Sequence, residues 1–83
     1  MSGKRSDMEI NAAILQVARN GAKKSHIVYQ ANLNFKIGKK YLERLIHSGL
    51  LKEPNGETHA FKTTAKGVDY LNYFRGLKDY LRP

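Results

Sequence analysis

The sequence predicts a mainly α-helical domain with one small β-hairpin, in the order helix, helix, helix, hairpin, helix. Two observations support this prediction. Residues 6–48 hold three amphipathic segments with helix start and stop signals, and residues 49–63 hold two short strand-like runs around a Pro-Asn-Gly turn. The chain has 83 residues, of which 41% are hydrophobic and 27% charged. This composition suits a single folded domain spanning 1–83, with residues 1–5 as a basic flexible tail.

The first helix is expected to begin after Ser6 and to end near Asn20. Ser6 and Glu9 stand in the S-x-x-E relation, in which the hydroxyl and the carboxylate each accept a hydrogen bond from a free backbone N–H. Gly21 then supplies a left-handed stop. One apolar stripe runs between these signals, formed by Ile10, Ala13, Ile14 and Val17.

A short second helix is expected over residues 26–31, with Ser25 as its cap. The sequence Asn-Leu-Asn that follows marks its end. Its apolar residues, which should face inward, are Ile27, Val28 and Ala31. The first and second helices would then be separated by one tight turn.

The third helix is expected over residues 35–48, with Asn34 as its cap and Gly49 as its stop. At about 100° per residue, one face is apolar and the opposite face is basic. The apolar face holds Tyr41, Leu42, Leu45 and Ile46, and the opposite face holds Lys36, Ile37, Lys40 and Arg44. Gly38 is unfavourable inside a helix, and we interpret it as a point of close approach, either for the first helix or for a ligand.

A hairpin should follow the third helix. Leu50 to Lys52 are expected to form a short strand, residues 53–57 a turn, and residues 58–62 the returning strand. Thr64 should then cap a C-terminal helix within 64–82. The apolar rows of this last helix consist of Val68, Leu71, Phe74, Leu77 and Leu81.

Positive charge is concentrated in one part of the chain. The net charge is +8, and residues 19–52 carry eight Lys or Arg against the single acid Glu43, a net of +7. A surface that served only solubility would mix the two signs. Charge of one sign in a small domain favours a polyanionic partner, of which nucleic acid is the usual example.

The order of elements, with "YQANLNFKIGKKYLERLIHSGLL" followed by "FKTTAKGVDYL", resembles the archaeal winged helix-turn-helix DNA-binding proteins that have a C-terminal dimerising helix. The resemblance covers about Ser6 to Leu81. It implies a recognition helix over 34–48 in the major groove and a wing, formed by the hairpin at 50–62, beside a phosphate backbone or minor groove. The chain departs from the family at Gly38, where an apolar residue is usual, which leaves open whether Ile37 points outward or the helix is locally rotated.

These features predict sequence-specific binding of double-stranded DNA by a transcriptional regulator. Lys23, Lys24, Lys39 and Lys40 suit phosphate contacts, which give affinity without sequence information. Base edges are within the expected reach of Lys36, Lys40 and Arg44, and an outward Ile37 would touch a thymine methyl. Asn34 is expected to contact the backbone as well as cap the helix, and His59 to contact phosphate at low pH. The alternatives are a sequence-tolerant chromatin protein and a winged-helix module that binds another protein.

The C-terminal helix is expected to form a homodimer. Tyr70, Phe74, Leu77 and Leu81 recur at spacings of 4, 3 and 4, the rhythm of a coiled-coil seam. Val68 and Leu71 are left to pack on the domain. The alternative is that all these residues, together with Tyr73 and Tyr80, cover the core of a monomer.

Other classes of function find little support. The histidines, His26, His47 and His59, fall on three different elements and the chain has no cysteine, so no metal site is expected. No pattern of acids or glycine-rich loop suggests an enzyme, a cofactor or a small-molecule ligand. No apolar run is long enough to cross a membrane. We expect a cytoplasmic, nucleoid-associated protein.

Overall fold

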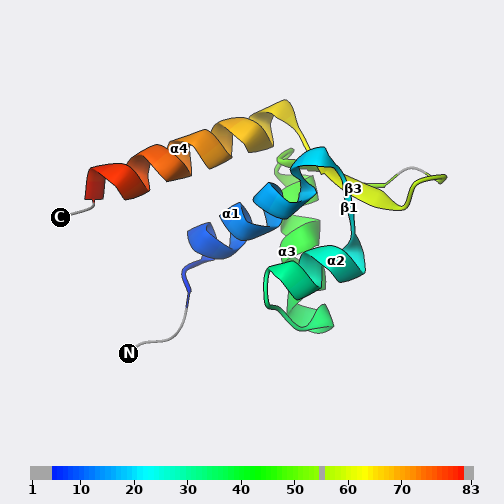
Figure 1. The fold of residues 1–83 in the computed structure, drawn as a ribbon. Coiled ribbons are helices and arrows are strands. Elements are labelled where there is room, and N and C mark those ends of the chain that lie inside the picture. The colour runs from blue at the N-terminus through cyan, green and yellow to red at the C-terminus, as the bar shows by residue number, and fades with distance from the viewer. Residues whose placement is uncertain (1–4, 55, 82–83) are drawn as a thin grey trace.

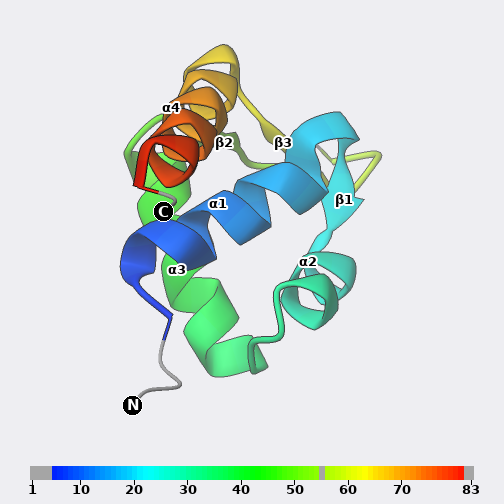
Figure 2. The same ribbon diagram turned by 60° about the vertical axis from the view of Figure 1, so that its left-hand side comes forward.

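The computed structural model describes residues 5–54 and 56–81. Within them the chain forms helix α1 (Asp7–Val17), the 3-10 turn η1 (Ala18–Asn20), strand β1 (Ala22–Lys23), helix α2 (Lys24–Gln30), helix α3 (Phe35–His47), strands β2 (Leu51–Lys52) and β3 (Ala60–Thr63), and helix α4 (Ala65–Leu81). Helices α1, α2 and α3 pack around one core, the strands lie at its edge, and α4 runs across α1 (Figures 1 and 2). The predicted fold class, mainly α with a small hairpin, is confirmed.

The start of α1 is the predicted capping box. The hydroxyl of Ser6 accepts from the N–H of Glu9 at 3.2 Å, and Glu9 Oε1 accepts from the N–H of Ser6 at 2.9 Å. The second of these bonds lowers the pKa of the Glu9 carboxyl, because it stabilises the charged form. Just before the box, Arg5 donates to the backbone oxygen of Ala31 at 2.6 Å, so this residue of the predicted tail lies against the end of α2.

The predicted start of α2 is wrong. The N-cap is Lys23 and makes no side-chain capping bond, while Ser25 lies inside the first turn. The reason is β1, which the sequence analysis did not predict. Lys23 pairs with Ala60 of β3, so the chain leaves the sheet and enters the helix directly, without room for a separate capping residue.

The turn between α2 and α3 has the predicted end signals. Asn32 adopts φ of 58°, and Leu33 donates its N–H to Val28 O, which closes α2 in a left-handed C-terminal motif. Asn34 then caps α3, with Oδ1 accepting from the N–H of Ile37 at 2.8 Å. The opposite end of α3 closes in the same way as α2 at Gly49, whose φ is 79°.

Gly38 is a point of close approach, but to α2 rather than to α1 or a ligand. It is buried, and a Cβ built on it would lie 2.7 Å from Val28 Cγ2. Real Cβ atoms essentially never approach a neighbour so closely, so Gly at this position sets the distance between α2 and α3.

The sheet has the order β1-β3-β2, with both pairings antiparallel. The predicted hairpin is therefore joined by a third strand. Its returning strand begins at Ala60 rather than at residue 58, because His59 takes a φ of 55°, which is incompatible with an extended ladder. The predicted Asn-Gly turn falls partly on residue 55, which lies outside the described residues.

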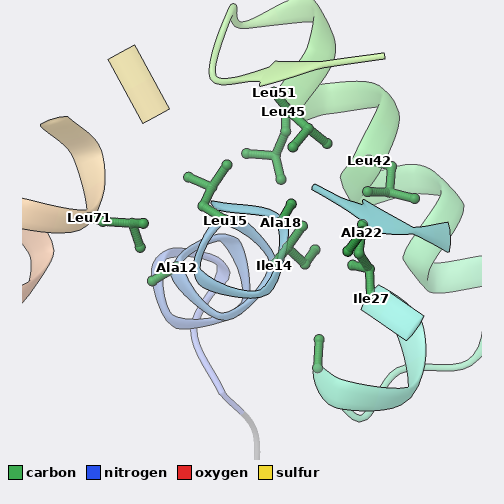
Figure 3. Packing of buried hydrophobic residues seen from close by; sticks show 11 residues of the cluster. Ala12, Ile14, Leu15, Ala18, Ala22, Ile27, Leu42, Leu45, Leu51 and Leu71 are labelled. Atoms are coloured by element: carbon green, nitrogen blue, oxygen red, sulfur yellow. The ribbon is translucent and has the colours of Figure 1, made fainter. Parts of the chain in front are cut away.

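Helix α1 lies at the centre of the core. Ile14 and Leu15 are fully buried, and side chains from every neighbouring element surround them (Figure 3). The surrounding residues labelled in the figure include Ala22, Ile27, Leu42, Leu45, Leu51 and Leu71. The buried Thr63 of β3 donates its hydroxyl to Leu15 O at 2.6 Å, which fixes the sheet on α1 without leaving a polar group unpaired.

Helix α4 is fixed to the end of α3 by its first turn. The predicted cap Thr64 accepts from the N–H of Gly67 at 3.1 Å and donates its hydroxyl to Gly49 O at 2.7 Å. Lys66 Nζ donates to Ser48 O at 2.9 Å. A Cβ on Gly67 would lie 2.2 Å from Leu50 O, so only Gly allows this approach. The Thr-x-Lys-Gly sequence thus builds the junction between α3 and α4.

Candidate nucleic-acid interface

The candidate interface is the outer surface of α2 and α3. Helix α3 packs on the core through its buried residues Gly38, Leu42 and Leu45. The predicted basic face of the helix therefore lies toward solvent. Lys36, Lys39 and Lys40 are exposed. Among the described residues, none of these three lysines has a carboxylate within ion-pair distance, so their charges are available to an external partner.

Lys23 and Lys24 add to this surface from the first turn of α2. Lys23 is exposed and Lys24 is half-buried, with its Nζ 5.9 Å from the centre of the Phe35 ring. Because a cation at the start of a helix opposes the helix dipole, Lys23 and Lys24 do not stabilise α2. Lys24 lies beside the first residue of α3, whereas Lys23 lies in β1 at the N-cap of α2. The other three predicted DNA-contacting lysines lie on α3.

Arg44 is engaged by the protein itself. Its Nη1 lies 3.8 Å from Asp7 Oδ2, and its guanidinium lies 5.2 Å from the centre of the Tyr41 ring. Tyr41 donates its hydroxyl to Asp7 Oδ1 at 2.5 Å, and this bond raises the pKa of the phenol. Both charged side chains are largely exposed, so the ion pair contributes only about 0–1 kcal/mol and a phosphate can compete for Arg44.

The remaining predicted contacts lie at the ends of this surface. Asn34 uses its Oδ1 to cap α3, so only its amide N–H groups remain as donors to a ligand. Ile37 is at the limit of exposure, with 36% of its surface accessible, so it lies on the outer surface of α3 and not in the core. His59 is exposed in the β2–β3 loop, directly before the first residue of β3, and is therefore part of the wing and not of α3.

A groove of about 340 Å³ separates α3 from the hairpin. Its floor is apolar, with Leu42, Ile46 and Phe61, and its rim carries both signs of charge. The rim residues are Lys24, Lys39, Glu43 and Glu53. The acids come from both sides of the groove, Glu43 from α3 and Glu53 from the hairpin, so the groove is mixed in charge.

The predicted dimerisation residues divide into two pairs. Tyr70 and Phe74 are half-buried and pack against the core, and Tyr70 also donates to Met8 O at 3.3 Å. Leu77 and Leu81 are 38% and 68% exposed. The end of α4 extends beyond α1 (Figure 1), so its last apolar residues are not covered by the described part of the chain.

Several residues that the sequence analysis did not assign are prominent on these surfaces. Phe35, at the start of α3, is 58% exposed, and Tyr73 and Tyr80 on α4 are 81% and 84% exposed. Asp7, whose carboxylate pairs with Arg44, was also not assigned from the sequence. A signal for Phe35 was present in its position directly after the cap Asn34, because it is the first residue of the predicted recognition helix.

Neither metal nor membrane chemistry is suggested by the described part of the chain. No group of three His, Asp or Glu side chains there is arranged to hold a metal ion. Among the described residues, no helix is both long enough and apolar enough to span a bilayer.

Two comparisons identify what the chain is similar to. A family model described as winged helix-turn-helix matches residues 4–82. Among solved structures, the chain is similar to the crystal structure of Sso10a-2, a DNA-binding protein from Sulfolobus solfataricus, with a TM-score of 0.82 and 24% sequence identity, covering 92% of this chain and 81% of that chain. At this identity the likeness concerns the fold. None of the curated proteins compared with the chain matches it.

Proposed function

Because the chain belongs to the winged helix-turn-helix family, we propose that it binds double-stranded DNA, with α3 in the major groove and the β2–β3 loop beside the phosphate backbone. The observation that carries the proposal is the set of unpaired lysines on α2 and α3. Lys36, Lys39 and Lys40 are exposed on α3, and Lys24 lies against Phe35 at its start. Among the described residues, no carboxylate lies within ion-pair distance of the three lysines of α3. Such a surface attracts the phosphates of a nucleic acid. The DNA-binding description of Sso10a-2 agrees with this proposal.

The biological role we propose is transcriptional regulation at specific sites, in the cytoplasm and on the nucleoid. Arg44 would read a base edge after exchanging its contact with Asp7 for one with guanine, which accepts two hydrogen bonds from a guanidinium. A second role, sequence-tolerant chromatin protein, is favoured by a different observation. The outward side chains of α3 are mainly lysines, which bind phosphate as point charges and discriminate poorly between bases.

We also propose that the protein is a homodimer joined through the free end of α4. This helix has 17 residues and is therefore about 25 Å long, and its last two turns expose Leu77, Tyr80 and Leu81. An apolar stripe of this size on a basic chain is covered most simply by a second copy related by a two-fold axis. Two recognition helices could then meet successive major grooves about 34 Å apart.

The test of DNA binding is a titration of the protein against a fluorescent 20-base-pair duplex at several salt concentrations. Neutralising roughly 4 to 6 phosphates per subunit gives log K a slope of about −0.9 per phosphate against log salt. The variant Lys36→Glu with Lys40→Glu should weaken binding at least about tenfold and flatten the slope by about 2.

The matched control is Arg75→Glu with Lys78→Glu, which makes the same two charge reversals on α4, outside the proposed surface. It should leave the slope close to that of the parent protein. Binding that is insensitive to salt, or absent at low salt, would contradict the DNA proposal and favour a module that binds another protein. Selection from a random duplex pool separates the two DNA roles, since a regulator gives a sharp motif and a chromatin protein a flat one.

A further inference from the structure

We propose that Phe35 reads thymine in the major groove by covering its C5-methyl group. The inference rests on the proposed binding of DNA by α3 and adds to it a base preference, A·T over G·C, at the position that the first turn of α3 meets. It assigns a role to a residue for which the fold itself has little use.

Phe35 belongs to a small set of large apolar side chains that the structure leaves exposed. Those on α4 lie where the proposed dimer would cover them. On α2 and α3 the exposed members are Tyr29, Phe35 and Ile37, with 79%, 58% and 36% of their surfaces accessible. Among these, Phe35 is the one that is more than half exposed and carries no polar group that could use water as a partner, so its exposure is not explained by the monomer.

The position of Phe35 is that of a base-reading residue. It is the first residue of α3, directly after the cap Asn34, and the first residues of a recognition helix contact base edges in helix-turn-helix complexes. One turn further along α3, the buried Gly38 lets this helix pack closely against the side chain of Val28 on α2, which fixes the orientation of the first turn of α3 relative to α2.

Charges around Phe35 would bring it to DNA and keep it there. Lys24 Nζ lies 5.9 Å from the ring centre, a weak cation–π contact that leaves the ammonium free to bind a phosphate. Lys36 and Lys39, on the same turn of α3, are exposed and have no carboxylate partner among the described residues. Phosphate contacts fix the register of a protein on a duplex, and here they would set the ring against a base edge.

A phenyl ring selects one group on that edge. It has neither donor nor acceptor, so it gains nothing from guanine or adenine and would bury the N4 amino group of cytosine without a partner. Thymine presents the one apolar group in the major groove, its C5-methyl. Removing one buried methyl from water is worth roughly a fourfold change in binding.

The test uses duplexes that differ only in this methyl group. Alternating A·T duplexes of 16 base pairs are compared with the same duplexes in which deoxyuridine replaces every thymidine, at one salt concentration. Uracil pairs as thymine does but lacks the methyl. The parent protein should bind the thymine duplex about fourfold more tightly per contacted methyl, and the variant Phe35→Ala should bind the two duplexes equally.

Two further variants serve as controls. Phe35→Leu keeps an apolar side chain and should retain part of the preference for thymine. Lys24→Ala removes a phosphate contact and should weaken both duplexes alike, with the thymine-to-uracil ratio unchanged. Because Phe35 is exposed, thermal melting should show Phe35→Ala folded, so a loss of preference is not a loss of structure.

The outcomes are distinct. A parent protein that binds both duplexes equally, with a steep salt dependence, overturns the role of Phe35 and leaves DNA binding in place. A preference that survives in Phe35→Ala but disappears in Ile37→Ala assigns the methyl contact to Ile37 and also overturns the inference. A protein that binds neither duplex at low salt contradicts the proposed function itself.

Discussion

Helices α3 and α4 are built alike on their inner faces and differently on their outer faces. Each has a buried glycine where a neighbour approaches closely: Gly38 of α3 meets the side chain of Val28, and Gly67 of α4 meets the backbone oxygen of Leu50. Outward, α3 presents lysines, whereas the free end of α4 presents leucine and tyrosine. The inner faces therefore fix the fold, and the outer faces differ as the two partners that we propose require, DNA for α3 and a second copy of the chain for α4.

The largest expected effect concerns the outer face of α4. The double variant Leu77→Glu with Leu81→Glu places four charges in the proposed two-fold seam, where each leucine would otherwise contribute roughly 1.5 kcal/mol or more. The dimer dissociation constant should rise at least about a thousandfold, which corresponds to about 4 kcal/mol. Sedimentation should then give the mass of one chain, 9.4 kDa, at micromolar concentration.

The control for this variant is Asn72→Glu, which adds a charge to an exposed position of α4 outside the apolar stripe. It should leave the oligomeric state unchanged. A parent protein that sediments at 9.4 kDa would show that the protein is a monomer and would contradict the proposed role of the outer face of α4.

The next effect tests the junction of α4 with α3. The variant Gly67→Ala brings a methyl group to 2.2 Å from Leu50 O and 2.5 Å from Thr63 Cγ2, and a backbone carbonyl has little freedom to move. We expect a loss of about 3 kcal/mol in the free energy of unfolding, measured by urea denaturation. Gly76→Ala is the control, since nothing lies within 4 Å of that position, and it should stabilise the helix by up to about 1 kcal/mol.

A smaller loss is expected for Gly38→Ala, because the neighbour is a side chain. The added methyl lies 2.7 Å from Val28 Cγ2, and the packing cost of about 2 kcal/mol is offset in part by the better helix propensity of Ala. Replacing Val28 with Ala as well makes room for the methyl. In the Val28→Ala background, Gly38→Ala should cost little or even stabilise, whereas equal costs in both backgrounds would show that the contact with Val28 is not responsible.

Much of the fold was predictable because its helix ends are encoded locally. Ser6 with Glu9, Asn34 and Thr64 each cap the helix that follows, at the positions where the sequence predicted them. The strand β1 was missed because two residues, Ala22 and Lys23, become a strand only through their pairing with Phe61 and Ala60, nearly forty positions away. Local propensity carries no information on such a pairing.

The candidate site was predictable in its charge and not in its contacts. Lys36 and Lys40 were assigned to the outer face of α3 from helical periodicity, and both are exposed in the structure. The partner of Arg44 could not be foreseen, since Asp7 lies on another helix and meets Arg44 only through the packing of α1 on α3. The exposure of Phe35 likewise depends on where the core ends, which a residue pattern does not show.

The smallest expected effect concerns the contact between Asp7 of α1 and Tyr41 of α3. The phenol of Tyr41 donates to Asp7 Oδ1, and this bond raises the pKa of Tyr41 above its usual value. Because the pKa is raised, the Tyr41–Asp7 hydrogen bond contributes fully to stability below about pH 10, the pKa of tyrosine in an unfolded chain. This contribution is lost as the pH rises through the higher pKa of Tyr41 in the folded protein. Because the pair is exposed, the contribution should be about 0.5 kcal/mol.

The measurement is the difference in phenolate absorbance between the parent protein and Tyr41→Phe, which isolates one of the five tyrosines. Replacing Asp7 with Asn should move the titration of Tyr41 to lower pH, because the amide that replaces the carboxylate does not repel the phenolate and accepts a weaker hydrogen bond.

The same variant, Asp7→Asn, releases Arg44 from its only ion pair among the described residues. If Asp7 restrains Arg44, Asp7→Asn should tighten DNA binding about two- to fivefold, and clearly less so when Arg44 is already Ala. An equal gain in both backgrounds would mean that Asp7 affects DNA binding only through its own negative charge. Arg44 would then be as free to bind DNA as the lysines of α3, and the ion pair with Asp7 would not restrain it.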